Sequence, residues 1–82
     1  MNDEADKLIA KLHRLYHAAV ANHINGVIFS DMFRAYKARG IESKNAAFCI
    51  HLSNAYFERT MMNLFTYIKL VKQLKEEYGI EF

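Results

Sequence analysis

The sequence predicts an all-α protein, and three observations carry this prediction. The 82 residues include no Pro and only three Gly, and β-branched runs are short, which favours helices over strands. From Ser43 to Tyr78 the chain has neither Gly nor Pro, and apolar residues recur alternately three and four positions apart, as in helices that pack lengthwise. The apolar content of 52% excludes a disordered chain. We expect one domain, residues 1–82, with two short helices packed on one long C-terminal helix and the helical bundle completed by self-association.

The first short helix is predicted from Asp3 to Asn22 or Asn25. Acidic residues near its start suit the positive end of a helix dipole, and Asn2 or Asp3 can cap it. Asn25-Gly26 is expected to end it, because Gly readily adopts the left-handed conformation of a helix C-terminus. Its apolar side is at amphipathic spacing and consists of Ala5, Leu8, Leu12, Leu15, Tyr16, Ala19 and His23.

The second short helix is predicted from Ser30, a favourable N-cap residue, to Gly40, which closes it. Its apolar side consists of Phe29, Met32, Phe33 and Tyr36. These residues have the spacing of a core-facing surface, and we expect Met32 to belong to the core rather than to a ligand site.

The long helix is predicted to begin after Ser43 as N-cap and to end at Tyr78. A helix of 35 residues spans about 52 Å, whereas a compact chain of this length has a radius of gyration of roughly 12 Å. The helix is therefore expected either to break near Ser53-Asn54 or to project and pair with a second chain, with Met61 and Leu64 at the buried centre. The predicted oligomer seam is Ile50, Asn54, Phe57, Met61, Leu64, Ile68 and Val71, within a heptad series that runs from Ala47 to Lys75 and Tyr78.

Charge is unevenly distributed along the chain. All eleven Lys and Arg lie between Lys7 and Lys75, where the acidic residues are only Asp31, Glu42 and Glu58. This basic excess fits either an acidic partner, including nucleic acid, or an ordinary solvated surface.

The single cysteine and the positions of charged residues indicate the redox state of the thiol and the cellular compartment of the protein. Cys49 is the only cysteine, and its apolar surroundings predict a buried, reduced thiol. The charged N-terminal residues do not resemble a secretory signal, and the least charged window contains Glu58 and Arg59 at its centre, where charge is most costly in lipid. We expect a cytoplasmic protein without a membrane segment.

Motifs for chemistry are absent from the sequence. His13 and His17 have the one-turn spacing of a metal-binding pair, but no carboxylate or thiolate follows at matching spacing. No nucleophile–base series, phosphate-binding loop or dinucleotide fingerprint is present. The sequence therefore predicts no enzyme, no cofactor and no metal.

The predicted function is binding of another protein by a small regulator, adaptor or inhibitor that also binds itself. Aromatic anchors carry much of the affinity at such interfaces, and the candidates are Phe29, Phe33, Tyr36, Phe48, Tyr56 and Tyr67.

The alternative is a DNA-binding helix-turn-helix over residues 30–52. Its phosphate contacts would be Arg34, Lys37, Arg39 and Lys44. Against it, Tyr36 stands where a tight helix crossing needs a small residue, and the would-be recognition helix is poor in the Arg and Gln that read bases.

Overall fold

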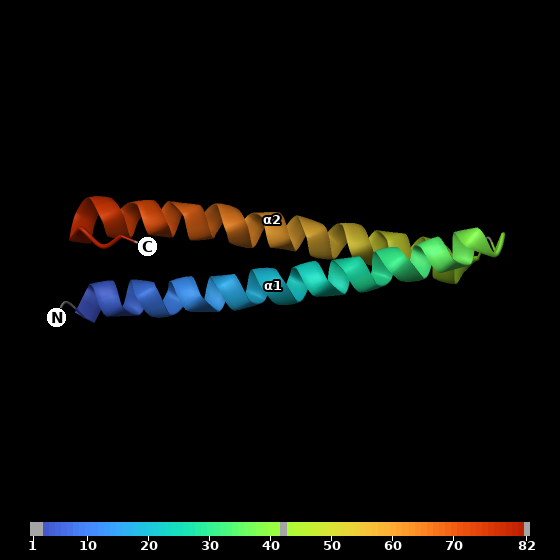
Figure 1. Ribbon diagram of the computed structural model, residues 1–82, viewed down its shortest axis with the longest axis horizontal. Helices are drawn as coiled ribbons and strands as arrows, with labels where there is room; N and C mark the ends of the chain where they lie inside the picture. The colour runs from blue at the N-terminus through green and yellow to red at the C-terminus, as the bar shows by residue number, and fades with distance from the viewer. Residues whose placement is uncertain (1–2, 42, 82) are drawn as a thin grey trace.

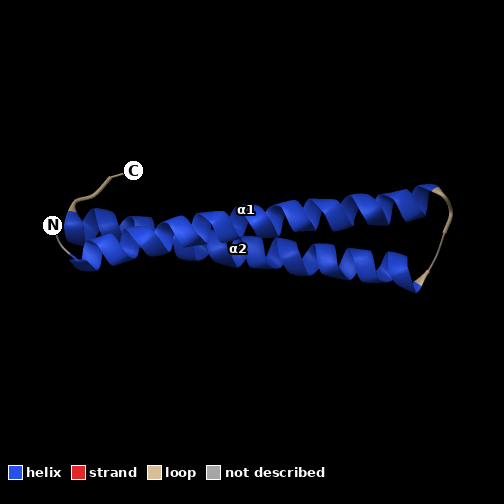
Figure 2. Cartoon of the chain, turned by 90° about the horizontal axis from the view of Figure 1, so that it is seen from below, coloured by secondary structure: helices blue, strands red, loops and turns tan. Residues whose placement is uncertain are grey.

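The computed structural model describes residues 3–41 and 43–81. It contains two helices, α1 (Asp3–Ala38) and α2 (Lys44–Tyr78). They lie side by side in opposite directions and are joined by a short turn, so that both chain ends lie at the same end of the molecule (Figures 1 and 2). The resulting rod measures 58 × 17 × 16 Å, with a radius of gyration of 17.7 Å. The prediction of an all-α fold is confirmed for the described residues.

The prediction of two short helices before the long one is wrong, because α1 is a single helix of 36 residues. Gly26 does not end a helix, and Ser30 lies inside α1 rather than at a new N-cap. Gly26 is required by a close approach to α2: a Cβ atom at this position would lie 2.7 Å from Cδ1 and Cε1 of Phe57. The local Asn25-Gly26 signal is therefore overridden by a contact with a distant residue.

Three of the four helix ends follow local sequence chemistry; at the fourth, α1 begins at Asp3, and the predicted cap residue Asn2 lies outside the described residues. Gly40 has a φ of +68°, and its N–H donates to the carbonyl of Lys37 at 3.0 Å, which closes α1. Ser43 caps α2, since its Oγ accepts from the N–H of Ala46 at 3.2 Å. Gly79 ends α2 in the left-handed conformation. No break interrupts α2 near residues 53–54, so the continuous form of the long helix is the one observed.

The two helices meet along heptad-spaced lines. The central line of α1 is Ala5, Leu12, Ala19 and Gly26, all buried. The central line of α2 is Ala46, Ser53, Thr60, Tyr67 and Leu74, all buried except the half-buried Tyr67. Small residues dominate the middle of both lines, which lets the helices approach closely.

The line of α2 that faces α1 therefore precedes the predicted seam by one residue. Met61 and Leu64 are 51% and 39% exposed, so the expectation that they lie at the buried centre is wrong for the single chain. A shift of one residue turns a helix by roughly 100°, and this rotation places the larger apolar side chains of α2 beside the helix contact rather than inside it.

Contacts between the helices change in character along the rod. A leucine cluster of Leu12, Leu70 and Leu74 lies at the end that carries the chain termini. In the middle, Asn22 Nδ2 donates to Asn63 Oδ1 at 2.9 Å. Nearer the turn, the rings of Phe29 and Tyr56 stack with centroids 5.8 Å apart and planes 3° apart. The large-side-chain core is thus confined to one end, and the thin rod leaves many apolar side chains uncovered.

Candidate functional site

One side of the rod carries an apolar surface built from both helices. In each helix this surface consists of the residues one and four positions after the central line. Because the helices run in opposite directions, these positions fall on the same side of the pair. His23 of α1 and Phe57 of α2 confirm the geometry, since their ring centroids are 5.7 Å apart. We call this surface the apolar face and define it as Tyr16, Val20, His23, Val27, Ile50, Asn54, Phe57, Met61, Leu64, Ile68 and Val71.

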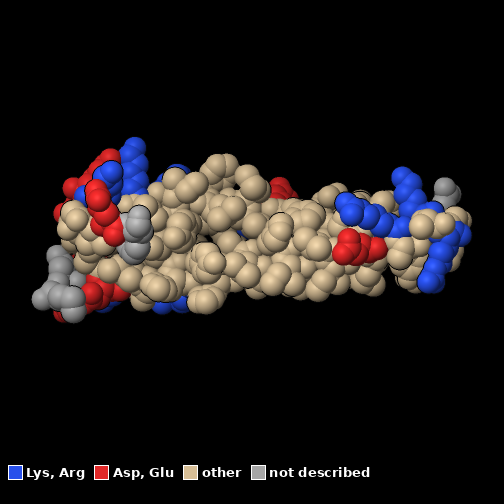
Figure 3. All heavy atoms as spheres, in the orientation of Figure 1, with Lys and Arg blue, Asp and Glu red and all other residues tan. Residues whose placement is uncertain are grey.

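The apolar face has no charged residue in its middle. Residues 15–30 of α1 contain no Asp, Glu, Lys or Arg, and residues 45–68 of α2 contain only Glu58 and Arg59. Those two residues occupy other positions of the heptad. Figure 3 shows the consequence: charges gather at both ends of the rod, and the visible surface between them is largely uncharged.

Two hollows open on the same side of the rod. The first has a volume of about 400 Å³ and is lined by Leu12, His13, Tyr16, His17 and Tyr67. The second, of about 390 Å³, lies beside the turn and is lined by residues that include Phe33, Lys37, Ile41 and Ile50. Both are open and mostly apolar, so they are suited to receive apolar side chains of another chain rather than to enclose a polar substrate.

All seven residues of the predicted oligomer seam lie on the apolar face. Met61, Leu64, Ile68 and Asn54 are exposed, and Ile50, Phe57 and Val71 are half-buried. The structure therefore brings the seam together on one surface, although that surface does not face α1.

Five of the six predicted partner-binding aromatics are half-buried within the chain. Phe29 and Tyr56 stack on each other, and Tyr67 lies 6.5 Å from Tyr16 between ring centroids. Phe33 and Tyr36 are half-buried near the turn, with Lys37 Nζ 5.8 Å from the Phe33 ring. Phe48 alone among the six is exposed, at 61%.

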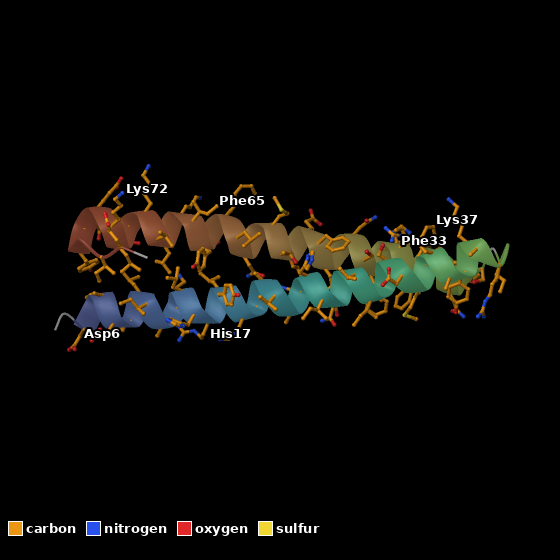
Figure 4. All side chains as sticks on the ribbon, in the orientation of Figure 1. Asp6, His17, Phe33, Lys37, Phe65 and Lys72 are labelled. Atoms are coloured by element: carbon orange, nitrogen blue, oxygen red, sulfur yellow. The ribbon has the colours of Figure 1, made fainter. Side chains whose placement is uncertain are left out.

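Two exposed apolar residues on the outer side of α2, Met62 and Phe65, were not singled out as site residues in the sequence. We call Phe48, Met62 and Phe65 the outer ridge; Phe48 is included because it shares their exposure. Figure 4 shows Phe65 pointing away from α1. The sequence did contain a signal for Met62 and Phe65, since both belong to the nearly charge-free part of α2. On α1, Val20 and Val27 were also missed, although they are spaced by seven residues.

The four predicted nucleic-acid contacts gather at the turn. Arg34 pairs with Asp31 at 3.8 Å, and both side chains are exposed. Lys37, Arg39 and Lys44 are also exposed, and Figure 4 shows Lys37 pointing away from the helix pair. The helices around this turn run antiparallel (Figure 2), whereas a helix-turn-helix crosses at roughly 90–120°. The basic residues are therefore present without the motif that was expected to position them.

The histidines and the cysteine occupy different surroundings. His13 and His17 are exposed, and the His17 ring lies 5.8 Å from that of Tyr16. Cys49 is buried and unpaired, as predicted. Within residues 3–41 and 43–81, no three His, Cys, Asp or Glu side chains are grouped closely enough to hold a metal ion. Over the same residues, neither helix has a stretch that is both long and apolar enough to cross a membrane.

Comparison of the chain with protein-family models, with curated proteins and with solved structures gave no match.

Proposed function

We propose that this protein acts by binding proteins and not by catalysis: it associates with a second copy of itself and serves as a regulator, adaptor or inhibitor of another protein. The observation that carries the proposal is the uncharged apolar face on an elongated helical hairpin. Monomeric soluble proteins rarely expose a large contiguous apolar patch, and such patches mark interaction sites.

Surface area supports self-association. The chain exposes 6250 Å², whereas a compact monomer of its 9.6 kDa mass exposes roughly 5100 Å². The excess of roughly 1150 Å² exceeds the ~800 Å² that each partner buries in a standard protein–protein interface. Covering one long side of the rod would bring the exposed area to that of an ordinary compact protein.

The outer ridge supports binding of a different protein. Phe48, Met62 and Phe65 lie outside the apolar face and stay accessible when that face is covered. Aromatic residues and Met are enriched at protein interfaces, and Met adapts to partners of different shape. Two separate surfaces therefore allow the protein to pair with itself and to bind its target at the same time.

Self-association is tested by light scattering coupled to gel filtration at about 10 μM, where a dimer is expected to dominate if its affinity is micromolar or better. We expect a mass of at least twice 9.6 kDa. A mass of one chain at that concentration would contradict self-association.

Binding of a target is tested by affinity capture from the native host with wild-type protein and with the double variant Phe48→Glu, Phe65→Glu. The control is Lys69→Glu, Lys72→Glu, which changes two exposed residues of the same helix. We expect a protein captured by the wild type and by the control but lost with the ridge variant. Equal capture by all three would contradict the role of the outer ridge.

A further inference from the structure

We propose that the apolar face is the contact between two copies of this chain, which pack face to face in antiparallel orientation to form a four-helix bundle. The inference rests on the self-association proposed above and adds which surface makes the contact and how the copies are oriented.

The choice of surface follows from the distribution of apolar residues around the rod. The apolar face joins two stripes, with Tyr16, Val20 and Val27 on α1 and Met61, Leu64 and Ile68 on α2. On the opposite side of the helix pair, which carries the residues three and six positions after the central lines, Arg59 interrupts the middle and Lys11 lies nearer the terminal end. Desolvating those charges would oppose association, whereas on the apolar face both helices offer a charge-free contact along the middle of the rod.

The shape of this surface suits an isologous contact. In a two-fold dimer the same patch is used by both copies, and an apolar stripe on each of two helices gives a four-helix arrangement in which every helix has two neighbours. Each helix of a bundle uses one face for each neighbour. The central lines make the contact within a chain, and the positions one and four residues later make the contact between chains. Because the contact within a chain and the contact between chains use different positions, the large apolar residues of α2 are not turned toward α1.

The ends of the rod decide the orientation. The terminal end carries six carboxylates against Lys7, Lys72 and Lys75, namely Asp3, Glu4, Asp6, Glu76, Glu77 and Glu81. Among the described residues, the turn end carries four basic residues against Asp31, namely Arg34, Lys37, Arg39 and Lys44. Figure 4 shows Asp6 and Lys37 near opposite ends of α1.

A parallel dimer would place the four basic residues of one turn beside the same four of its partner. An antiparallel dimer places each basic turn beside the acidic terminal end of the other copy. Like charges at an interface oppose association and opposite charges favour it, so the antiparallel arrangement is the one that both the apolar middle and the charged ends allow.

The surface is tested with two pairs of adjacent residues. Met61→Glu and Val20→Glu place a carboxylate on the apolar face, and Met62→Glu and Ala21→Glu place one on the neighbouring exposed position outside it. All four side chains are exposed in the single chain, so the hairpin itself is expected to stay helical by circular dichroism. At about 10 μM, as above, we expect the first two variants to fall from a dimer to the 9.6 kDa monomer and the last two to remain dimeric.

The orientation is tested with the double variant Cys49→Ala, Arg39→Cys. This variant leaves the apolar face unchanged and carries one spin label per chain, at the turn. Electron–electron distance measurement is expected to give a separation comparable to the 58 Å length of the rod, because the two turns lie at opposite ends. A separation well under half of that length would mean a parallel dimer and would overturn the orientation.

The remaining outcomes separate this inference from the proposed function. A wild type that is monomeric at all concentrations overturns both. A wild type that is dimeric, with Met61→Glu and Val20→Glu equally dimeric, leaves self-association standing and overturns the apolar face as its site. Dissociation by Met62→Glu or Ala21→Glu alone would assign the contact to the outer side of the helix that carries the change.

Discussion

Ser53 Oγ of α2 donates a hydrogen bond to the carbonyl oxygen of Gly26 in α1 at 2.9 Å. Both residues are buried, and Ser53 is 1% exposed. The missing Cβ of Gly26 makes room for Phe57 beside it. A small residue on one helix and a hydroxyl on the other thus fix the register of the hairpin between its middle and the turn, because a shift of either helix would leave the buried hydroxyl without its acceptor.

We expect Ser53→Ala to lower the free energy of unfolding by about 1 kcal/mol relative to a matched control, because it removes a buried hydrogen bond between the helices. The control is Thr66→Ala, which removes an exposed hydroxyl bonded to the carbonyl of Met62 within α2. Both changes gain helix propensity to a similar degree, so the difference isolates the contact with Gly26. Urea denaturation measures both values, and equal values would mean that the bond contributes nothing.

We expect Gly26→Ala to be destabilising, although the same change at an open helical site stabilises by about 1 kcal/mol. The new Cβ would lie 2.7 Å from the Phe57 ring, which must move and lose its contact with His23. Ala21→Gly, at an exposed position of α1, calibrates the intrinsic difference between the two residues in this helix.

The steric cause of that effect is tested by a double-mutant cycle. In a Phe57→Ala background the clash is gone, and Gly26→Ala is expected to become stabilising. If Gly26→Ala stabilises the protein even with Phe57 present, the helices are farther apart than the structure places them.

Local chemistry made several parts of this fold predictable from sequence. Ser43, Gly40 and Gly79 act within one turn of their own helix ends, and their residue types determine their roles. Gly26 was misassigned because the same residue type serves two purposes. As an Asn-Gly pair it indicates a helix end, and only the distant Phe57, which the sequence does not connect to it, shows that it serves close packing.

The seam of α2 illustrates a second limit. Two heptad series run along this helix one residue apart. The series of large apolar residues, with Met61 and Leu64, is the more visible one. The series that faces α1 contains Ser53 and Thr60, which resemble surface residues in a linear sequence. Residue size alone therefore indicates a series of apolar residues along one side of α2 but does not say which helix, or which chain, covers it.

Truncation of two leucines is expected to separate the contact within the chain from the contact between chains. Leu74 is 0% exposed in the leucine cluster, so Leu74→Ala is expected to cost ~2–5 kcal/mol at any protein concentration. Leu64 is 39% exposed in the single chain. Leu64→Ala is therefore expected to lower the free energy of unfolding of the single chain by about 1 kcal/mol, and by more where the wild type is dimeric.

The measurement is thermal unfolding at about 2 μM and about 200 μM, since association makes the midpoint depend on concentration. We expect the gap between wild type and Leu64→Ala to widen at the higher concentration, while the gap for Leu74→Ala stays constant. A constant gap for both variants would mean that Leu64 makes no contact with a second chain.

The basic turn is the remaining test of the alternative function. Arg34, Lys37 and Lys44 gather at the turn between the two helices. The antiparallel hairpin, however, does not present a recognition helix in the way that a helix-turn-helix does. Arg34 is also paired with Asp31. We therefore expect no sub-micromolar binding to random-sequence DNA at physiological salt, measured by fluorescence anisotropy.

A salt series makes this prediction specific. DNA binding through these residues would weaken with a log–log slope of roughly −0.9 per phosphate contacted, and removing the three side chains together would abolish it. The matched control removes three exposed lysines or arginines from the other half of the rod: Lys11, Arg14 and Lys72. Both triple variants lose the same charge, so a general electrostatic attraction to DNA falls equally in the two.

Tight, salt-sensitive binding that is lost only with the turn variant would contradict our expectation and favour a nucleic-acid-binding role for the turn. Weak binding that falls equally in both variants would reflect the net positive charge of the chain and would leave protein binding as the function.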